Sequence, residues 1–363
     1  MRFLLNSARI FLLMYTPKYR ITNRILRFIS SIEACKEVID HAPLLPFYEK
    51  QFQQDAIIRS VHYGTHLEGN ELDLTQAERV IKGEEVLARE RDIQEVINYR
   101  KVIEYISQWE DPNFNKEITE SVIKHIHSIV VDKILPKEKQ GEYRSSQVVI
   151  KNSYTGHVSF RPPPSALVPI QIRELLEFLG SKESNDVHSV LKSGIVHFEF
   201  VRIHPFVDGN GRVGRALSTL ILFEEGYDIR RFFSLEEYYD KNASKYYQAL
   251  QSVEKNDNDL TLWLDYFTEG LAVELSRVKN KVEKISVDGK LRQKLGGKPL
   301  LLSERQLKII EYIQEVGYLQ NKAFASLFPM VSEDTVLNDL KELLKNGIIK
   351  KQGSTKGAKY IMS

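Results

Sequence analysis

Apolar side chains recur at helical spacing along most of this 363-residue chain, and three stretches interrupt the pattern. The first, Leu67-Glu68-Gly69-Asn70, is followed by Thr75-Gln76-Ala77-Glu78, which matches a capping box at the start of a helix. The second contains residues 143–150 and 157–160, which flank an Asn/Ser/Gly turn typical of a β-hairpin. The third is the loop at 204–215. The chain is therefore predicted to be mainly α with a small β-hairpin.

A separate unit is predicted at the C-terminal end. The polar, Lys/Gly-rich stretch from Asp288 to Lys298 is typical of a linker. Beyond it, two helices are expected at Ser303–Val316 and Ser332–Lys345, with a short helix between them and a final hairpin around Gly353 to Gly357. The second helix carries its apolar residues on one face, at Val336, Leu337, Leu340, Leu343 and Leu344. This order of elements predicts a winged helix-turn-helix.

Composition excludes several classes of protein. The 51 basic and 49 acidic residues nearly balance, so bulk charge predicts neither a nucleic-acid nor a membrane partner. The one cysteine, Cys35, excludes an intrachain disulfide framework and a cysteine-rich zinc site, and fits a reducing cytosol. The apolar start, Met1 to Tyr15, is too short to span a bilayer and lacks a clear cleavage site, so a leading helix or an over-extended start is expected. We expect a cytoplasmic protein without a membrane partner.

The loop from His204 to Arg215 reads His-Pro-Phe-Val-Asp-Gly-Asn-Gly-Arg-Val-Gly-Arg. The run Gly209-Asn210-Gly211 tolerates unusual backbone angles, so successive N–H groups can converge on an anion. A helix that begins near Arg212 adds the positive end of its dipole. Arg212 and Arg215 are three residues apart, and both can donate to phosphate oxygens. The loop therefore predicts an anion site, most readily for a nucleotide phosphate.

Two further residues of the loop suggest chemistry as well as binding. Asp208 offers a hard carboxylate that suits Mg²⁺ bridging two phosphates. His204 has an ordinary pKa near neutrality and suits removal of a proton from an incoming hydroxyl. Alone, a histidine before Pro-Phe is usually structural and Asp-Gly is usually a turn. Together with the arginines they favour transfer of a phosphorus-containing group to an alcohol.

The segment Gly209 to Gly214 also fits the dinucleotide fingerprint GxGxxG. That fingerprint follows a buried strand in a βαβ unit. Here residues 187–200 are predicted to be helical, no βαβ rhythm follows, and two arginines belong to the loop. We interpret the match as coincidental.

These residues resemble the signature of the Fic (Fic/Doc) family, HxFx(D/E)GNGRxxR, which His204 to Arg215 matches completely. Residues from about 100 to 285 resemble the helical Fic core, including His197 before the loop and Lys245-Tyr246-Tyr247 after it. The resemblance implies AMP transfer from ATP to a Ser, Thr or Tyr hydroxyl of a protein, with release of pyrophosphate. By position it implies that His204 is the general base and that Asp208 is the Mg²⁺ ligand. The implied nucleotide-binding residues are Asp208, Gly209, Asn210, Gly211, Arg212, Val213, Gly214, Arg215, Tyr246 and Tyr247.

Gly211 bears on the type of reaction that the resemblance implies. The Doc branch carries a lysine at this position, which changes the phosphate that is attacked, whereas glycine leaves room for the β- and γ-phosphates. Adenylylation is therefore expected rather than phosphorylation. The hairpin resembles the family's flap, with Ile150, Lys151, Asn152 and Ser153 as the residues that would pair with an extended target segment. An ordinary surface hairpin remains the alternative.

Leu67-Glu68-Gly69-Asn70 resembles the inhibitory motif [S/T]xxxE[G/N] of Fic proteins that carry an inhibitory helix. Glu68 is expected at the C-terminal end of a helix, where a negative charge gains from an external cation. The resemblance implies that this cation is Arg215, so that the pair displaces productive ATP. Gly64 stands where the motif has its hydroxyl residue, and Thr65 comes one position later. In some members this glutamate also serves removal of AMP, and Glu68 could do the same.

We therefore predict an inhibitory region (1–100), a Fic core (101–285), a linker (286–300) and a winged helix (301–363). The acidic residues of the candidate recognition helix favour a protein-interaction or dimerisation role over DNA binding, while basic residues in the hairpin keep DNA contact open. Expected partners are a hydroxyl-bearing target protein, the chain itself through self-modification, and a second copy in a homodimer. The alternative function is a transcriptional regulator that senses nucleotide.

Overall fold

The computed structural model describes residues 15–285 and 302–363, apart from 43, 45, 112–113, 115, 152–157, 228–230, 330 and 354–356. The chain divides into two compact units. The first comprises Met1–Glu33, Ala56–Ile229 and Phe233–Glu274, and the second comprises Ala34–Asp55, Arg230–Phe232 and Leu275–Ser363. The first unit thus joins parts of the predicted inhibitory region and the predicted Fic core. The predicted linker lies outside the described residues, and the domain boundaries stay predictions.

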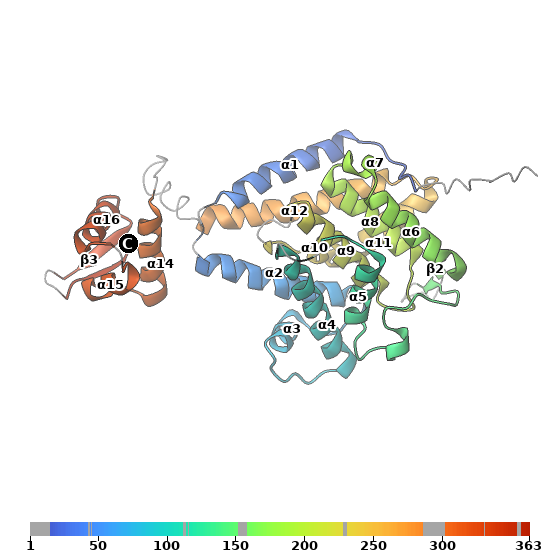
Figure 1. Cartoon of the computed structure of the whole chain (residues 1–363), viewed down its shortest axis with the longest axis horizontal. Helices are drawn as coiled ribbons and strands as arrows, with labels where there is room; N and C mark the ends of the chain where they lie inside the picture. The colour runs from blue at the N-terminus through green and yellow to red at the C-terminus, as the bar shows by residue number, and fades with distance from the viewer. Residues whose placement is uncertain are drawn as a thin grey trace, which may run out of the picture. The chain divides into compact units, whose positions relative to one another are not determined.

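Helices make up most of the described chain, which confirms the predicted fold class (Figure 1). Up to residue 285 they are α1 (Asn23–Asp40), α2 (Pro46–His66), α3 (Leu74–Ile81), α4 (Glu90–Ser107), α5 (Glu120–Val130), α6 (Val168–Leu179), α7 (Lys182–Asn185), α8 (Ser189–Ile203), α9 (Asn210–Glu224), α10 (Leu235–Lys241), α11 (Ala243–Lys255) and α12 (Thr261–Ile285). Strand β1 (Ile150–Lys151) pairs antiparallel with β2 (Val158–Phe160). No helix among the described residues is both long enough and apolar enough to cross a bilayer.

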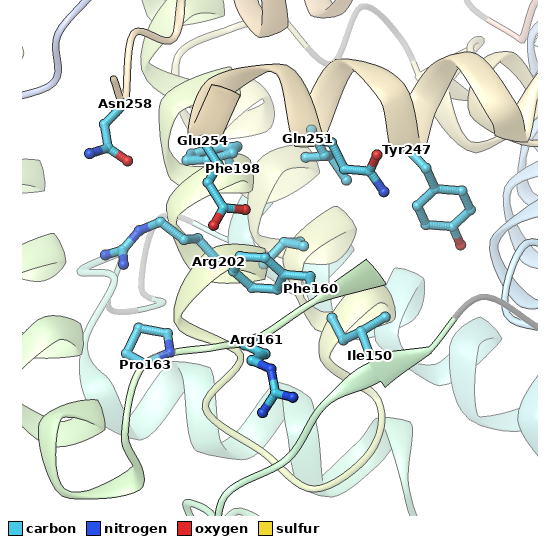
Figure 2. Close-up of a pocket in the computed structure, with 12 residues that line it drawn as sticks. Ile150, Phe160, Arg161, Pro163, Phe198, Arg202, Tyr247, Gln251, Glu254 and Asn258 are labelled. Carbon is cyan, nitrogen blue, oxygen red and sulfur yellow. The ribbon is translucent and has the colours of Figure 1, made fainter. Parts of the chain in front are cut away.

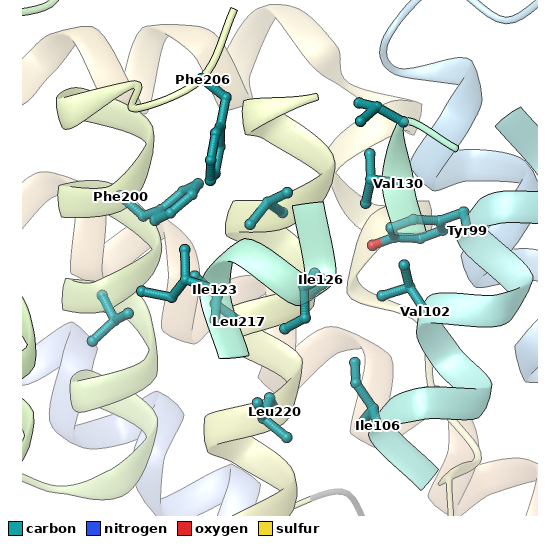
Figure 3. Packing of buried hydrophobic residues seen from close by; sticks show 14 of the residues in the cluster. Tyr99, Val102, Ile106, Ile123, Ile126, Val130, Phe200, Phe206, Leu217 and Leu220 are labelled. Carbon is teal, nitrogen blue, oxygen red and sulfur yellow. The ribbon is translucent and has the colours of Figure 1, made fainter. Parts of the chain in front are cut away.

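The core of the first unit lies where α8 and α9 pack side by side, with α4, α5 and α6 against them. Both helices of the central pair are buried along most of their length, and their buried side chains include polar and charged ones such as His197, Arg212 and Arg215. Figure 3 shows rings and branched side chains from four helices and the loop meeting beneath the loop: Tyr99, Val102, Ile106, Ile123, Ile126, Val130, Phe200, Phe206, Leu217 and Leu220. Burial of each such side chain stabilises the fold by roughly 1.5–3 kcal/mol. The loop between α8 and α9 is therefore supported by a well-packed core.

Two local predictions need correction. Helix α3 is capped by Asp73 and not by Thr75: the Asp73 carboxylate accepts from the Gln76 N–H (2.8 Å), and the Gln76 side chain accepts from the Asp73 N–H (3.0 Å). The hairpin is also shorter than predicted. Its first strand begins at Ile150, because the backbone N–H of Arg144 bonds to the Pro205 carbonyl (2.8 Å) rather than to a β partner.

The C-terminal part of the second unit confirms the predicted winged helix-turn-helix. It contains α14 (Glu304–Val316), α15 (Phe324–Leu327), α16 (Glu333–Lys345), β3 (Ile349–Gln352) and β4 (Lys359–Met362). The two strands pair antiparallel, with Ile349 opposite Met362. A capping box at Ser303 begins α14, and Ser332 caps α16. Of the predicted apolar stripe, Val336, Leu340 and Leu343 are buried, and Leu337 and Leu344 pack at its edge.

Part of the acidic charge of α16 faces its neighbour α14. Asp339 is buried and accepts both Arg305 Nε (2.5 Å) and Arg305 Nη2 (3.3 Å). Glu342 accepts from the Gln306 side chain (2.6 Å). These two acids hold the helices together, so the charge that α16 offers to a partner is less negative than its composition suggests.

Candidate active site

The loop between α8 and α9 is held by two left-handed residues. His204 ends α8 with φ +51°, and Gly209 precedes α9 with φ +79°. Asn210, the first residue of α9, closes a ring with Phe206: its Oδ1 accepts the Phe206 N–H (2.8 Å), and its Nδ2 donates to the Phe206 carbonyl (2.9 Å). Asn210 is buried. Its predicted role at the phosphates therefore rests on its backbone, because its side chain is used to shape the loop.

The imidazole of His204 is oriented by a backbone carbonyl. Its Nδ1 lies 3.2 Å from the Val201 carbonyl, an acceptor, so Nδ1 carries the proton and Nε2 keeps its lone pair. Burial lowers the pKa of His204 below its ordinary value, although the Val201 carbonyl and the Glu68 charge act in the opposite direction. The imidazole is therefore neutral at pH 7, as a general base requires.

Arg144 belongs to no motif in the sequence, yet its side chain holds the loop between α8 and α9 through hydrogen bonds. It is buried, and its guanidinium donates to the carbonyls of His204 (2.8 Å) and Ser146 (3.2 Å), as well as to those of Pro163 and Ile203. A guanidinium at the end of α8 also faces the negative end of the helix dipole. Arg144 thus joins the loop between α8 and α9 to the base of the hairpin.

His127 of α5 supports the other side of the loop. Its ring stacks on Phe206 with a centroid separation of 3.7 Å and an interplanar angle of 1°. Its Nδ1 accepts the Gly141 N–H (2.9 Å), so Nε2 carries the proton and donates to the Asp208 carbonyl (3.2 Å). Burial lowers the pKa of His127 to about 4. A protonated ring would lose the bond from Gly141.

This arrangement predicts a pH dependence of stability. The pKa of His127 is near 6.5 in an unfolded chain and about 4 when folded, so its contribution is complete above pH 6.5 and is lost as the pH falls toward 4. The wild-type protein should lose up to about 3 kcal/mol from this residue over that range. Urea denaturation of wild type and His127→Gln at pH 7.5 and 4.5 measures it. A difference between the two proteins that does not shrink at pH 4.5 would contradict the prediction.

Asp208, the predicted metal ligand, lies in a ring of opposite charges. Its Oδ1 accepts the Gly209 N–H (2.6 Å) and lies 3.3 Å from Arg212 Nη2, while its Oδ2 lies 2.8 Å from Arg91 Nη2. Burial alone would raise the pKa of Asp208, but Arg212, Arg91 and the Gly209 N–H lower it, so the carboxylate is charged. Arg212 also lies 3.1 Å from Glu95.

A lone carboxylate of this kind fits Mg²⁺ that a triphosphate brings with it. Among the described residues no group of three or more His, Cys, Asp or Glu side chains forms a metal cluster. Mg²⁺ commonly takes one or two carboxylates, with phosphate and water oxygens as its other ligands. The N–H groups of Gly211 and Arg212 precede the first intrahelical bond of α9, from Val213 to Gly209 (3.0 Å), and so are available to those phosphates.

Arg215 is engaged by the segment that resembles the inhibitory motif. It is buried, and its Nη2 donates to Glu68 Oε1 and to the Gly64 carbonyl, each at 2.8 Å. Burial alone would lower the pKa of Arg215, but Glu68 and two nearby tyrosines raise it, so the guanidinium stays charged. The predicted end of α2 is confirmed, since the helix ends at His66 and Gly69 has φ +94°.

The departure from the inhibitory motif at position 64 has a steric reason. A side-chain carbon on Gly64 would lie 2.6 Å from the ring of Tyr99, so no hydroxyl residue fits there. Thr65 is buried, and its hydroxyl donates to the carbonyls of Val61 (2.9 Å) and His62 (3.0 Å). Gly64 instead offers its carbonyl to Arg215.

Glu68 also covers Gly211. A side chain on Gly211 would collide with Glu68 Oε1 and would lie 3.2 Å from Arg215 Nη1. The carboxylate of Glu68 therefore fills the space beside Gly211 that a side chain at this position would occupy. Val213 is buried, and Gly214 packs tightly against Val201 and Phe200 of α8. These two residues therefore pack the first turns of α9 against the core.

The two predicted tyrosines have different surroundings. Tyr246 is buried, and its hydroxyl lies 2.9 Å from Nε2 of His197, whose pKa burial lowers to about 3. Burial raises the pKa of Tyr246 to about 12. Tyr246 is not among the residues that line the cavity described below, and its role as a nucleoside wall stays a prediction. Tyr247 is partly exposed, and its hydroxyl donates to the Leu67 carbonyl (3.3 Å).

A cavity of about 290 Å³ lies between the hairpin and helices α8 and α11 (Figure 2). Ile150 and Phe160 come from the hairpin, Phe198 from α8, and Tyr247 from α11. Gln251 and Glu254 add polar atoms along the same face of α11. Of the predicted flap residues, Ile150 lines this cavity, the side chain of Lys151 is outside the description, and Asn152 and Ser153 lie outside the described residues.

Comparison with known proteins finds a family match in two segments of the chain. Residues 117–222 match the Fic/DOC family, and residues 305–359 match the DeoR-like helix-turn-helix domain. The chain thus carries a Fic domain followed by a helix-turn-helix domain of the DeoR type.

Relatives and solved structures agree with this assignment. The chain is 29% identical over 213 residues to the protein adenylyltransferase Fic of Aedes aegypti, covering 57% of this chain and 39% of that protein. It is 27% identical over 195 residues to the protein of the same name from Nematostella vectensis, covering 53% of this chain and 44% of that protein. The chain thus spans less than half the length of these curated relatives. A Fic family protein from Desulfovibrio desulfuricans has the same fold, with a TM-score of 0.64, 23% identity and coverage of 96% and 98% of the two chains.

Proposed function

We propose that this chain is a protein adenylyltransferase that transfers AMP from ATP to a Ser, Thr or Tyr hydroxyl of a protein. The observation that carries the proposal is the orientation of His204, whose protonated Nδ1 faces the Val201 carbonyl and whose Nε2 is left as a base. In the chain this base precedes the N-terminus of α9, which suits phosphate. Curated relatives named protein adenylyltransferase support the type of reaction.

In the proposed reaction, the target hydroxyl gives its proton to His204 Nε2 as its oxygen attacks the α-phosphorus of ATP. The bond from the α-phosphorus to the bridging oxygen breaks, and pyrophosphate leaves with the bond's electrons. The N–H groups at the start of α9 and the guanidinium of Arg212 would bind the phosphates. Asp208 would hold Mg²⁺, which supplies charge neutralisation for the leaving pyrophosphate.

The cavity between the hairpin and α11 is proposed to receive the nucleoside. It combines the ring of Tyr247 and apolar side chains with the polar ends of Gln251 and Glu254, a lining that suits a flat heterocycle with a polar edge. The hairpin would present its outer strand edge to an extended target segment. Either another protein or a second molecule of the same chain could supply that segment.

We further propose that Glu68 inhibits the transfer. Its carboxylate pairs with Arg215 and fills the space beside Gly211, where triphosphate oxygens would otherwise lie. A bound carboxylate and a phosphate cannot occupy the same position, so the pair excludes productive ATP. The same carboxylate lies close enough to the loop to position a water for AMP removal, and we propose this as a second role.

The type of reaction can be tested with ATP labelled at the α- or at the γ-phosphorus. The Glu68→Gly variant should attach the α label to protein, including itself, and release the γ label as pyrophosphate. This is expected because Gly211 leaves room for the β- and γ-phosphates, so that the α-phosphorus would face the target hydroxyl. Attachment of the γ label to protein, or of neither label, would overturn the proposal.

A further inference from the structure

Arg91, at the start of α4, approaches the active site from outside the signature loop. Its Nη2 lies 2.8 Å from Asp208 Oδ2, and its Nε lies 3.1 Å from Glu95 Oε1, one helical turn along α4. Arg212 contacts the same two acids, at 3.1 Å from Glu95 and 3.3 Å from Asp208. Two acids and two arginines therefore alternate in a closed ring.

The two oxygens of Asp208 differ in their surroundings. Oδ1 is held by the Gly209 N–H and by Arg212, both parts of the loop itself. Among the described residues, Oδ2 has a single partner, Arg91. The Arg91 side chain is 59% exposed, whereas that of Arg212 is 2% exposed. Oδ1 is thus held by residues of the loop and of α9, and Oδ2 is covered by one exposed side chain.

We propose that Oδ2 of Asp208 is the metal-binding oxygen and that Arg91 is its displaceable cover. This inference rests on the proposed function. A Mg²⁺ ion must approach a carboxylate oxygen to about 2.1 Å. A guanidinium on the same oxygen occupies that direction and repels the cation. Binding of Mg²⁺ therefore requires Arg91 to leave Oδ2, and Glu95 retains it through the Nε contact.

The inhibitory segment reinforces this cover. Asn70, two residues after Glu68, donates from Nδ2 to Glu95 Oε2 (3.1 Å) and to the Asp92 carbonyl (3.0 Å). Asn70 and Glu95 are both buried. Glu95 is therefore fixed in place and aims Arg91 at Asp208. One short segment then acts at two points: Glu68 occupies Arg215, and Asn70 supports the residue that positions Arg91.

The test measures binding of a nucleotide and needs no transfer. Binding of α,β-methylene ATP to the full chain is followed by calorimetry at increasing Mg²⁺, in the Glu68→Gly background so that the pocket is open. Arg91→Ala should lower the Mg²⁺ concentration at half-maximal binding by about two- to fivefold, the range expected for a partly exposed ion pair. Arg100→Ala is the matched control, because Arg100 makes the same kind of pair with Glu104 on α4 (2.8 Å) away from the loop.

A second background tests the atom involved. In Glu68→Gly/Asp208→Asn, the carboxylate is gone, so Arg91→Ala should no longer shift the Mg²⁺ midpoint. An unchanged midpoint in Arg91→Ala with Asp208 intact would overturn the inference while leaving the proposed function standing. An equal shift in Arg100→Ala would overturn it too. Failure of the Glu68→Gly protein to bind magnesium nucleotide at all would instead count against the proposed function.

Discussion

Replacing His204 with alanine should lower the rate of AMP transfer by roughly a hundred- to ten-thousand-fold, the usual contribution of general acid–base catalysis. The reason is that Nε2 of His204 is the atom left to accept the proton of the attacking hydroxyl. The measurement is the initial rate of label transfer from ATP labelled at the α-phosphorus, in the Glu68→Gly background, with wild-type His204 as the reference.

A binding measurement separates lost chemistry from a lost site. His204→Ala should bind magnesium α,β-methylene ATP with nearly unchanged affinity, because the loop is shaped by Asn210, Arg144 and His127 rather than by the imidazole of His204. Equal label on the two proteins would show that the labelling does not depend on His204, and would favour the nucleotide-sensing regulator. Loss of both binding and rate would assign His204 a structural role.

The second large effect is expected from Glu68→Gly, which should raise AMP incorporation by about 5- to 150-fold, the range of typical coupling energies between a regulatory contact and a site. Removing the carboxylate frees Arg215 and opens the space beside Gly211. Steady-state incorporation into the chain itself provides the assay, so that no target protein is needed.

Glu71→Gly is the matched control for this substitution. Glu71 lies three residues further along, is exposed, and pairs with Arg89 (3.2 Å) rather than with Arg215. The control should show the activity of wild type. Equal activity of Glu68→Gly and wild type would refute inhibition by Glu68, whereas activation of both variants would point to a general loosening of the segment.

The sequence predicted the helical core and the loop well because both are local. The spacing of apolar residues set the helices, and the signature from His204 to Arg215 is contiguous. The hairpin was predicted too long for a tertiary reason: Arg144 is bonded to the loop after α8, 60 residues away. No sequence pattern near Arg144 predicts its hydrogen bonds to the carbonyls of His204 and Pro205.

The supporting residues of the site could not be predicted for the same reason. His127, Arg91 and Glu95 reach the loop from α4 and α5, more than 75 residues earlier in the chain. Tyr246 and Tyr247 are adjacent in sequence, yet one is buried and the other lines a cavity, a difference that only the packing of α11 decides.

The charge of α16 gave a misleading picture for a related reason. Counting acidic residues assumed that all of them face a partner, but Asp339 and Glu342 bond to α14. The argument from charge against DNA contact is weaker once these two acids are set aside. Protein interaction and DNA contact by the winged helix both stay predictions.

The carbonyl of Gly64 has a consequence for the proposed release of inhibition. The Gly64 carbonyl accepts from the same guanidinium nitrogen of Arg215 as Glu68 does. This bond would keep the Arg215 side chain in place after the Glu68 carboxylate moves away. Release then needs the motion of one side chain and no rebuilding of the pocket. A single rotation of the Glu68 side chain would then be enough to start the proposed AMP transfer.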